Sequence, residues 1–254
     1  MAFPCRYLIC LWLYAPVVCP GQVQTSQPHA VAVHFTVFSR QRLTGLCYQP
    51  SPRARPVGVQ FFPQARSERF GYRGPAELAF YEEADWTEYT RNKAANPAAA
   101  LPSPVAVARL PVGMKEALLL FVPLPEAQAG GIRFGVLAVD DDPARFPPGQ
   151  LGVINVTGRV YTAQVGRKVL AVPPGRGENL AVAGPVEFRL ACREEGQWVA
   201  AGHHAFTVGP TSRVCLVLFP ATSATGVGPV IRTLVDAPPS KARERTAALL
   251  APAK

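Results

Sequence analysis

The feature that most constrains this sequence is a pattern that occurs twice. A Gly-Pro pair at Gly74 and another at Gly184 each open a short run of mixed apolar and polar residues. Both runs pass through two adjacent glutamates to a tryptophan, Trp86 and Trp198. Matching apolar segments follow downstream, LLLFVP in the first half and CLVLFP in the second, and strands ending in Val-Asp come after them. Matches in the same order indicate duplication, so the fold must be one that a chain can build twice in tandem.

The boundaries of the two copies follow from these matches. The first copy is expected over residues 31–142 and the second over residues 149–236. Residues 143–148 (PARFPP) form a short proline-rich linker, which the proline rings stiffen. Residues 237–254 are charged and rich in alanine, and they are expected to form a flexible tail or a weak helix.

The first copy has about fifteen extra residues between its tryptophan and its LLLFVP segment. Residues 87–104 (TEYTRNKAANPAAALPSP) are rich in Ala, Asn and Pro and show no strand alternation. This composition predicts an exposed loop inserted into the first copy.

Composition and turn signals favour an all-β fold. The chain has 27 prolines and 21 glycines, and hydrophobic residues make up 48% of it, enough to build a core. The second copy contains seven short apolar runs between breakers, the strand count of an immunoglobulin-like sandwich, and no segment shows a convincing helical period. The sequence therefore predicts two tandem homologous Ig-like β-sandwich modules after a signal peptide.

The N-terminal residues have the three parts of a secretory signal. A basic residue, Arg6, precedes an apolar run, and a Cys-Pro-Gly exit ends at Gly21. We expect residues 1–21 to be a signal peptide and the chain to be exported to the periplasm, the cell surface or the medium, with no membrane span in the mature chain. Lipidation at Cys19 and an uncleaved anchor are the alternatives.

Three cysteines lie beyond the leader: Cys47, Cys192 and Cys215. Cys192 and Cys215 are the plausible pair, but a strand is expected between the strands that carry them. We therefore expect buried free thiols, with a Cys192–Cys215 disulfide as the alternative.

The net charge of +9 favours an anionic partner. The arginines are dispersed and no nucleic-acid-binding motif occurs, so an anionic polysaccharide or an envelope protein is expected rather than nucleic acid. One basic and aromatic cluster, Arg66, Arg69, Tyr72 and Arg73, has no counterpart in the second copy. It is the predicted binding surface.

Acidic residues offer a candidate metal site. Asp140, Asp141 and Asp142 precede a proline, and carboxylates near a turn can bind a hard cation such as calcium. The run lacks the alternating ligands of a calcium loop, and Asp before Pro is also a common start of a turn. We expect no metal or cofactor, with these three aspartates as the candidates if there is one.

Other residues that look chemical have structural interpretations. The pair Glu82-Glu83 recurs as Glu194-Glu195 before the same tryptophan, which indicates solvated turns rather than an acid–base pair. Neighbouring strand residues face opposite ways, so His203 and His204 are expected to point to different sides and not to share an ion. Asn155 begins a sequon that matters only in a eukaryotic source.

The aromatic residues Trp86, Tyr89, Tyr161 and Trp198 could line a sugar-binding face, since rings stack on sugars. Because the two tryptophans recur together, we expect them to be hairpin or core residues. No nucleophile elbow, P-loop or dinucleotide fingerprint occurs in the sequence. These observations favour a protein that is not an enzyme.

The LLLF-x-P segment, the FPPGQLGVINVTG segment and the Val-Asp endings resemble uncharacterised secreted β-sandwich proteins of environmental bacteria such as the Verrucomicrobia. The resemblance implies no activity. The sequence thus predicts an exported, non-enzymatic binding or structural protein that engages an anionic glycan or a protein partner in the cell envelope. A periplasmic pilus-type chaperone with two Ig-like domains and an envelope hydrolase with dispersed catalytic residues are the alternatives.

Overall fold

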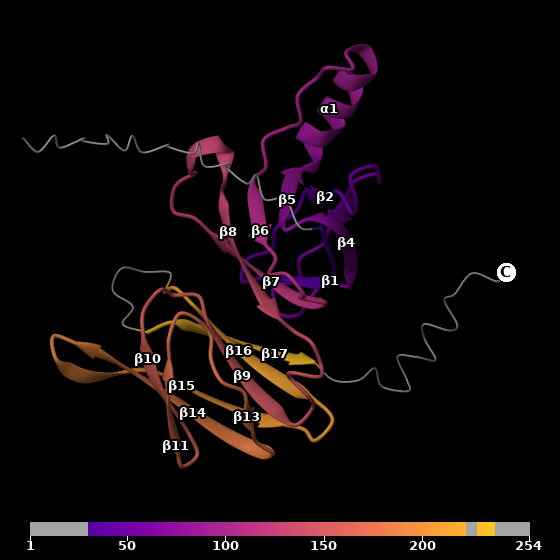
Figure 1. Ribbon diagram of the computed structural model, residues 1–254. Helices are drawn as coiled ribbons and strands as arrows, with labels where there is room; N and C mark the ends of the chain where they lie inside the picture. The colour runs from indigo at the N-terminus through magenta and orange to yellow at the C-terminus, as the bar shows by residue number, and fades with distance from the viewer. Residues whose placement is uncertain (1–29, 222–227, 237–254) are drawn as a thin grey trace, which may run out of the picture.

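The computed structural model describes residues 30–221 and 228–236, and this part of the chain is mostly β (Figure 1). Strands make up 53% of the structure and form three sheets, with one α-helix. The predicted signal peptide at residues 1–21 and the predicted tail at residues 237–254 lie outside the described residues.

The first half forms one curled, eight-stranded sheet, shaped as a half-barrel. Strands β1 (Ala30–Ser39) and β7 (Glu116–Pro123) pair in parallel, as do β6 (Ala106–Arg109) and β8 (Phe134–Asp140), and the other neighbours are antiparallel. Rings such as Phe35, Phe80 and Phe121 fill the concave side. In spatial order the strands are β3 (Val57–Val59), β2 (Leu46–Tyr48), β5 (Glu77–Glu82), β6 (Ala106–Arg109), β8 (Phe134–Asp140), β7 (Glu116–Pro123), β1 (Ala30–Ser39) and β4 (Phe70–Pro75).

The second half forms two sheets around a separate core that includes Tyr161, Phe188 and Leu216. One sheet contains, in order, β11 (Lys168–Val172), β10 (Tyr161–Val165), β14 (Gly184–Glu194) and β15 (Gln197–Val208). The other contains β12 (Gly175–Arg176), β9 (Gln150–Asn155), β16 (Arg213–Phe219) and β17 (Val230–Asp236), and β13 (Leu180–Ala181) also pairs with β9.

The strands pair in the same order in both halves. The series β3-β2-β5-β6 corresponds to β11-β10-β14-β15, and β8-β7-β1 corresponds to β17-β16-β9, including the parallel pair in each. The halves differ where β6 and β8 pair in parallel and join the first half into one sheet. A β-rich fold is confirmed, while the Ig-like assignment and the homology of the halves stay predictions.

The two halves pack against each other through a third apolar core. Phe38 and Leu118 come from β1 and β7, Val217 and Phe219 come from β16, and Phe146 comes from the segment between the halves. Phe146 is only 1% exposed, so residues 143–148 are built into this core rather than spanning open solvent. Every residue of β16 is buried because the strand lies between two cores, which confirms that it is central.

The prediction of a loop over residues 87–104 was wrong for its first half. Helix α1 (Glu83–Ala95) continues directly from β5 and extends beyond the end of that strand (Figure 1). Acidic residues lie in its first turn and Lys93 in its last, which suits the helix dipole, and the chain leaves the helix just before Pro97. The helix buries only Trp86, so its sequence carries no apolar period that could have revealed it.

Candidate functional site

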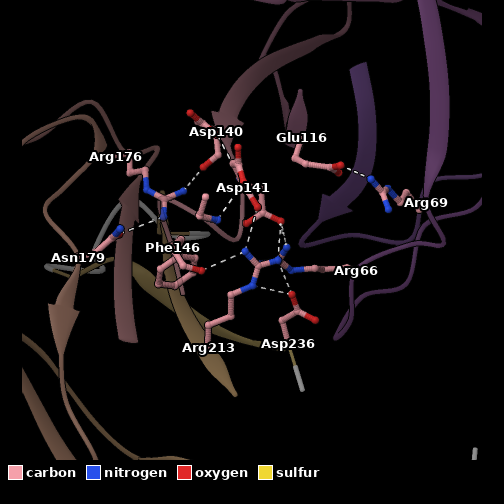
Figure 2. Close-up of polar contacts among 12 residues, drawn as sticks. Arg66, Arg69, Glu116, Asp140, Asp141, Phe146, Arg176, Asn179, Arg213 and Asp236 are labelled. Atoms are coloured by element: carbon pink, nitrogen blue, oxygen red, sulfur yellow. Dashed lines mark hydrogen bonds and ion pairs between the residues drawn. The ribbon is translucent and has the colours of Figure 1, made fainter. Parts of the chain in front are cut away.

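Two arginines and two aspartates lie together where the halves meet, all of them buried except Asp236, whose side chain is 38% exposed (Figure 2). Arg66 precedes β4, Asp141 follows β8, Arg213 begins β16 and Asp236 ends β17. The side chains of Arg66, Asp141 and Arg213 are 11%, 9% and 10% exposed. Asp141 Oδ2 accepts hydrogen bonds from Arg66 Nη1 and, at 3.3 Å, from Arg213 Nη2. Arg213 Nε also donates to Asp236 Oδ2 at 2.7 Å.

Backbone carbonyls extend this junction cluster. Arg213 Nη1 donates to the carbonyls of Asp141, at 2.9 Å, and Phe146, at 3.3 Å. The ring of Phe146 lies between two guanidinium groups, with its centroid 4.7 Å from Arg176 Cζ and 5.5 Å from Arg213 Cζ. Two carboxylates and two backbone carbonyls accept hydrogen bonds from the Arg213 guanidinium, as a buried arginine requires, whereas Arg66 pairs with Asp141 and its Nε and Nη2 are buried without a hydrogen-bond partner among the described residues. The junction cluster therefore fixes the position of one half on the other.

The four residues of the predicted binding surface do not share one exposed face. Arg66 lies in the junction cluster, and Tyr72 is 8% exposed because alternation along β4 turns it into the core. Arg69 and Arg73 point outward, and Arg69 forms an ion pair with Glu116. The basic cluster was thus wrong as a single surface, since strand alternation and the junction separate its members.

The three consecutive aspartates do not converge on a cation. Asp140 Oδ2 accepts from Arg145 Nη1 at 2.6 Å, and Asp141 is held by Arg66 and Arg213. Asp142 Oδ1 accepts the backbone N–H of Ala144 at 2.9 Å and so closes a turn. Within the described residues no group of three His, Cys, Asp or Glu side chains could hold a metal ion. The candidate site fails because the carboxylates are engaged by guanidinium groups and by a turn amide.

The adjacent histidines separate as predicted. His203 is exposed, while His204 is half-buried and its Nε2 lies 2.6 Å from Thr233 Oγ1 of β17. Asn155 is 1% exposed, and its Nδ2 donates to the carbonyls of Arg159 and Val172. The sequon asparagine is therefore unavailable to a glycosylating enzyme in the folded protein.

The three described cysteines are free and buried, as expected. Burial raises the pKa of the thiols of Cys47 and Cys215 to about 11. Both thiols stay protonated at neutral pH, so they act as small apolar groups rather than as nucleophiles or metal ligands.

The most distinctive exposed feature is the outer face of the β11-β10-β14-β15 sheet. Trp198 of β15 is 61% exposed, and the Arg193 guanidinium of β14 lies directly opposite it, 5.8 Å from the ring centroid. The recurrence of the two tryptophans predicted a hairpin or core residue. Trp198 does lie near the start of the strand after a hairpin turn, but its ring is exposed to solvent.

Next to this ring the strand register aligns small side chains across the sheet. Thr162, Ala191 and Ala200 face one another on neighbouring strands and form the floor of a trough. A bulge in β15 then shifts the register, so that His203 stands beside Arg189 on the same outer face. These two side chains form one wall of the trough, and the Arg193–Trp198 pair forms the other.

Three adjoining hollows of about 430, 460 and 540 Å³ lie along this trough. The first two share Thr162 and Trp198, and the second and third share Arg189 and Ala200, so the hollows are neighbours along the sheet face. The trough combines a stacking ring, basic groups and small polar groups, which suits binding of an extended ligand.

The corresponding face of the first half is partly covered. Tyr81 on the outer face of β5 packs against Trp86 of α1, with ring centroids 4.9 Å apart. Cys47, opposite Tyr81 on β2, is 2% exposed. Trp86, at the start of the helix, thus covers part of the sheet face that the second half leaves open.

Sequence reasoning missed the trough because its floor is made of alanines, which no motif search singles out. The available signal was the set of β14 side chains that point outward, in which Arg189 and Arg193 lie two residues before and after Ala191. That signal gains meaning only when Trp198 and Ala200 are known to lie alongside.

Comparison with known proteins gives no assignment: no family model matches the chain, and no curated protein matches it. Among the helices of the described residues, none has the length and apolar character needed to span a bilayer.

Proposed function

We propose that this protein is an exported, non-enzymatic binding protein, made of two copies of one Ig-like β module, that holds an anionic polymer in the trough of the second copy. The observation that carries the proposal is the trough itself, in which an exposed tryptophan stands beside Arg193 on an otherwise recessed sheet face.

The common order of strand pairing supports duplication, because the parallel pair and its flanking hairpin recur in each half. The leader sequence supports export, and the net charge of +9 supports an anionic ligand. The junction cluster makes the two copies one rigid carrier for the binding face.

Binding fits the trough better than catalysis does. The two carboxylates at its margin are engaged, Glu187 by Arg189 and Glu194 by Arg159, each with oxygen and nitrogen 2.9 Å apart. A guanidinium group has five N–H donors, so Arg189 and Arg159 can bind an incoming anion while they keep these carboxylates engaged. The chaperone and hydrolase alternatives have no comparable support among the described residues.

The test is retention of the purified protein on immobilised acidic polymer as salt is raised. We expect the double variant Arg189→Ala/Arg193→Ala to elute at lower salt than the parent protein, because two phosphate-, sulfate- or carboxylate-binding groups are lost. The matched control is Arg69→Ala/Arg73→Ala, which removes the same charge from the exposed part of the first half. Equal losses in both variants, or a larger loss in the control, would overturn the proposed site.

A further inference from the structure

The geometry points to an anionic polysaccharide as the polymer, lying across the strands with one sugar ring stacked on Trp198. This inference rests on the proposed function and names the ligand class of the same site. It depends on three properties of the trough: its direction, the chemistry of its lining and its recessed position on a sheet face.

The trough runs across the strands rather than along them. Its floor is the cross-strand row of Thr162, Ala191 and Ala200, and Ala171 of β11 continues this row to the edge of the sheet. Neighbouring strands lie about 4.8 Å apart, so a row over four strands is roughly 14 Å long, room for a few linked sugar units. A ligand in this row is necessarily extended and narrow.

The walls supply what a charged sugar chain needs. Trp198 offers an apolar ring face, which stacks on the C–H groups of a sugar ring. On the other side lie Val169, Gln164, Arg189 and His203, the next row across the same strands. Thr162 and Gln164 can exchange hydrogen bonds with sugar hydroxyls, and the arginines can take carboxylate or sulfate groups in paired hydrogen bonds.

Other anionic partners fit this geometry less well. Single-stranded nucleic acid is usually held by several stacking rings, whereas Trp198 is the only large aromatic side chain in the lining of the three hollows that is exposed. An extended peptide typically adds to a strand edge through backbone hydrogen bonds, and the trough lies on a face. A membrane surface calls for a continuous set of projecting apolar groups, whereas here the exposed Val160, Val169 and Trp198 are separated by a row of small side chains and interspersed with arginines.

The test is calorimetric titration of the full chain with four probes. Three are chains of matched length, a polyuronate oligosaccharide, its neutral counterpart and single-stranded DNA, and the fourth is anionic phospholipid vesicles. We expect the uronate to bind at least about tenfold more tightly than each other probe. Trp198→Ala should lose about tenfold or more of that affinity, and Trp198→Phe should recover most of it.

A second variant, Ala191→Phe, fills the floor without removing any charge and should abolish uronate binding. Ala191 lies on the outer face, so the variant should fold, as circular dichroism would verify. If DNA or vesicles bind through Arg189 and Arg193 as tightly as the uronate, with no effect of Trp198→Ala, the polysaccharide inference is overturned and the proposed function stands. If none of the anionic probes binds, the proposed function falls with it.

Discussion

The two halves of the molecule share one order of strand pairing but differ in how far the outer face of one sheet is covered. In the first half α1 follows β5 and its buried Trp86 packs on Tyr81. In the second half β14 turns straight into β15, and Trp198 is 61% exposed beside Arg193. The tryptophans occupy matching places in the sequence and have opposite environments.

This difference teaches that the segment after β5 or β14 determines whether this sheet face is covered. In the first half this segment is a polar helix, α1, that buries only one side chain, Trp86. The Trp86 ring is nevertheless enough to cover part of the sheet face. Without such a helix, the second half keeps a row of small side chains between two walls. The half with the shorter connection is therefore the one that leaves this sheet face open.

If the halves form one unit, the largest loss of stability should come from breaking the junction cluster. Arg213→Met leaves the buried Asp141 with Arg66 alone and removes the partner of Asp236, which is 38% exposed, so we expect the free energy of unfolding to fall by about 3 kcal/mol. Urea denaturation measures it. Arg109→Met is the control, since Arg109 and Glu77 form a pair that is 88% and 66% exposed. A similar small loss in both variants would mean that the junction does not hold the halves.

How far the sequence predicts this molecule depends on the range of the interactions. Residues 213–219 were recognised as a central strand because continuous apolar runs need cover on both sides, which is a local property. The junction cluster joins Arg66 to Asp141 and Arg213, residues far apart in the chain. A basic residue looks the same in sequence whether it faces solvent or a buried carboxylate, so Arg66 was taken for part of a surface.

The helix and the trough were missed for related reasons. A helix that buries one side chain leaves no apolar period, so α1 could not be separated from a loop by pattern alone. The trough needs the exact register of β14 against β15, including the bulge that aligns His203 with Arg189. Register is set by packing across the whole sheet, which single-strand alternation does not reveal.

The two tryptophans provide the next test of the comparison. Trp86→Ala removes a buried ring, so we expect a loss of about 3 kcal/mol in the free energy of unfolding. Trp198→Ala removes an exposed ring and should change it by no more than about 0.5 kcal/mol. Both are measured by urea denaturation followed by circular dichroism. Equal losses would show that the rings share one structural role.

Alkaline pH should weaken the first half through its buried phenols. Burial raises the pKa of Tyr48 and Tyr72 from 10.0 to about 12, because the charged phenolate is poorly solvated in the core. The unfolded chain ionises first, so stability that is fully present below pH 10.0 is lost as the pH rises to about 12. Tyr48→Phe should flatten this dependence while costing about 1 kcal/mol at neutral pH through the lost hydrogen bond to the Gly71 carbonyl.

That prediction is checked by urea denaturation of the parent and variant at a series of pH values, with absorbance at the phenolate band reporting ionisation. Tyr72→Phe is the companion variant, because its hydroxyl donates to the Pro75 carbonyl in the same core. A parent protein whose stability does not change from pH 10.0 to about 12 would contradict the burial of these hydroxyls.

The smallest effect concerns the place where the halves differ in pairing. In the first half β6 and β8 share backbone hydrogen bonds, whereas in the second half the equivalent strands β15 and β17 are linked through side chains, His204 Nε2 to Thr233 Oγ1 at 2.6 Å. Thr233→Val keeps the shape and removes the hydroxyl, so we expect a loss of about 0.5–1 kcal/mol. Amide hydrogen exchange should become faster at the open edge of β15 in this variant and stay unchanged at β6. Equal changes in exchange at β15 and β6 would contradict this role of the contact between His204 and Thr233. They would mean that the variant destabilises the whole molecule rather than the edge of β15.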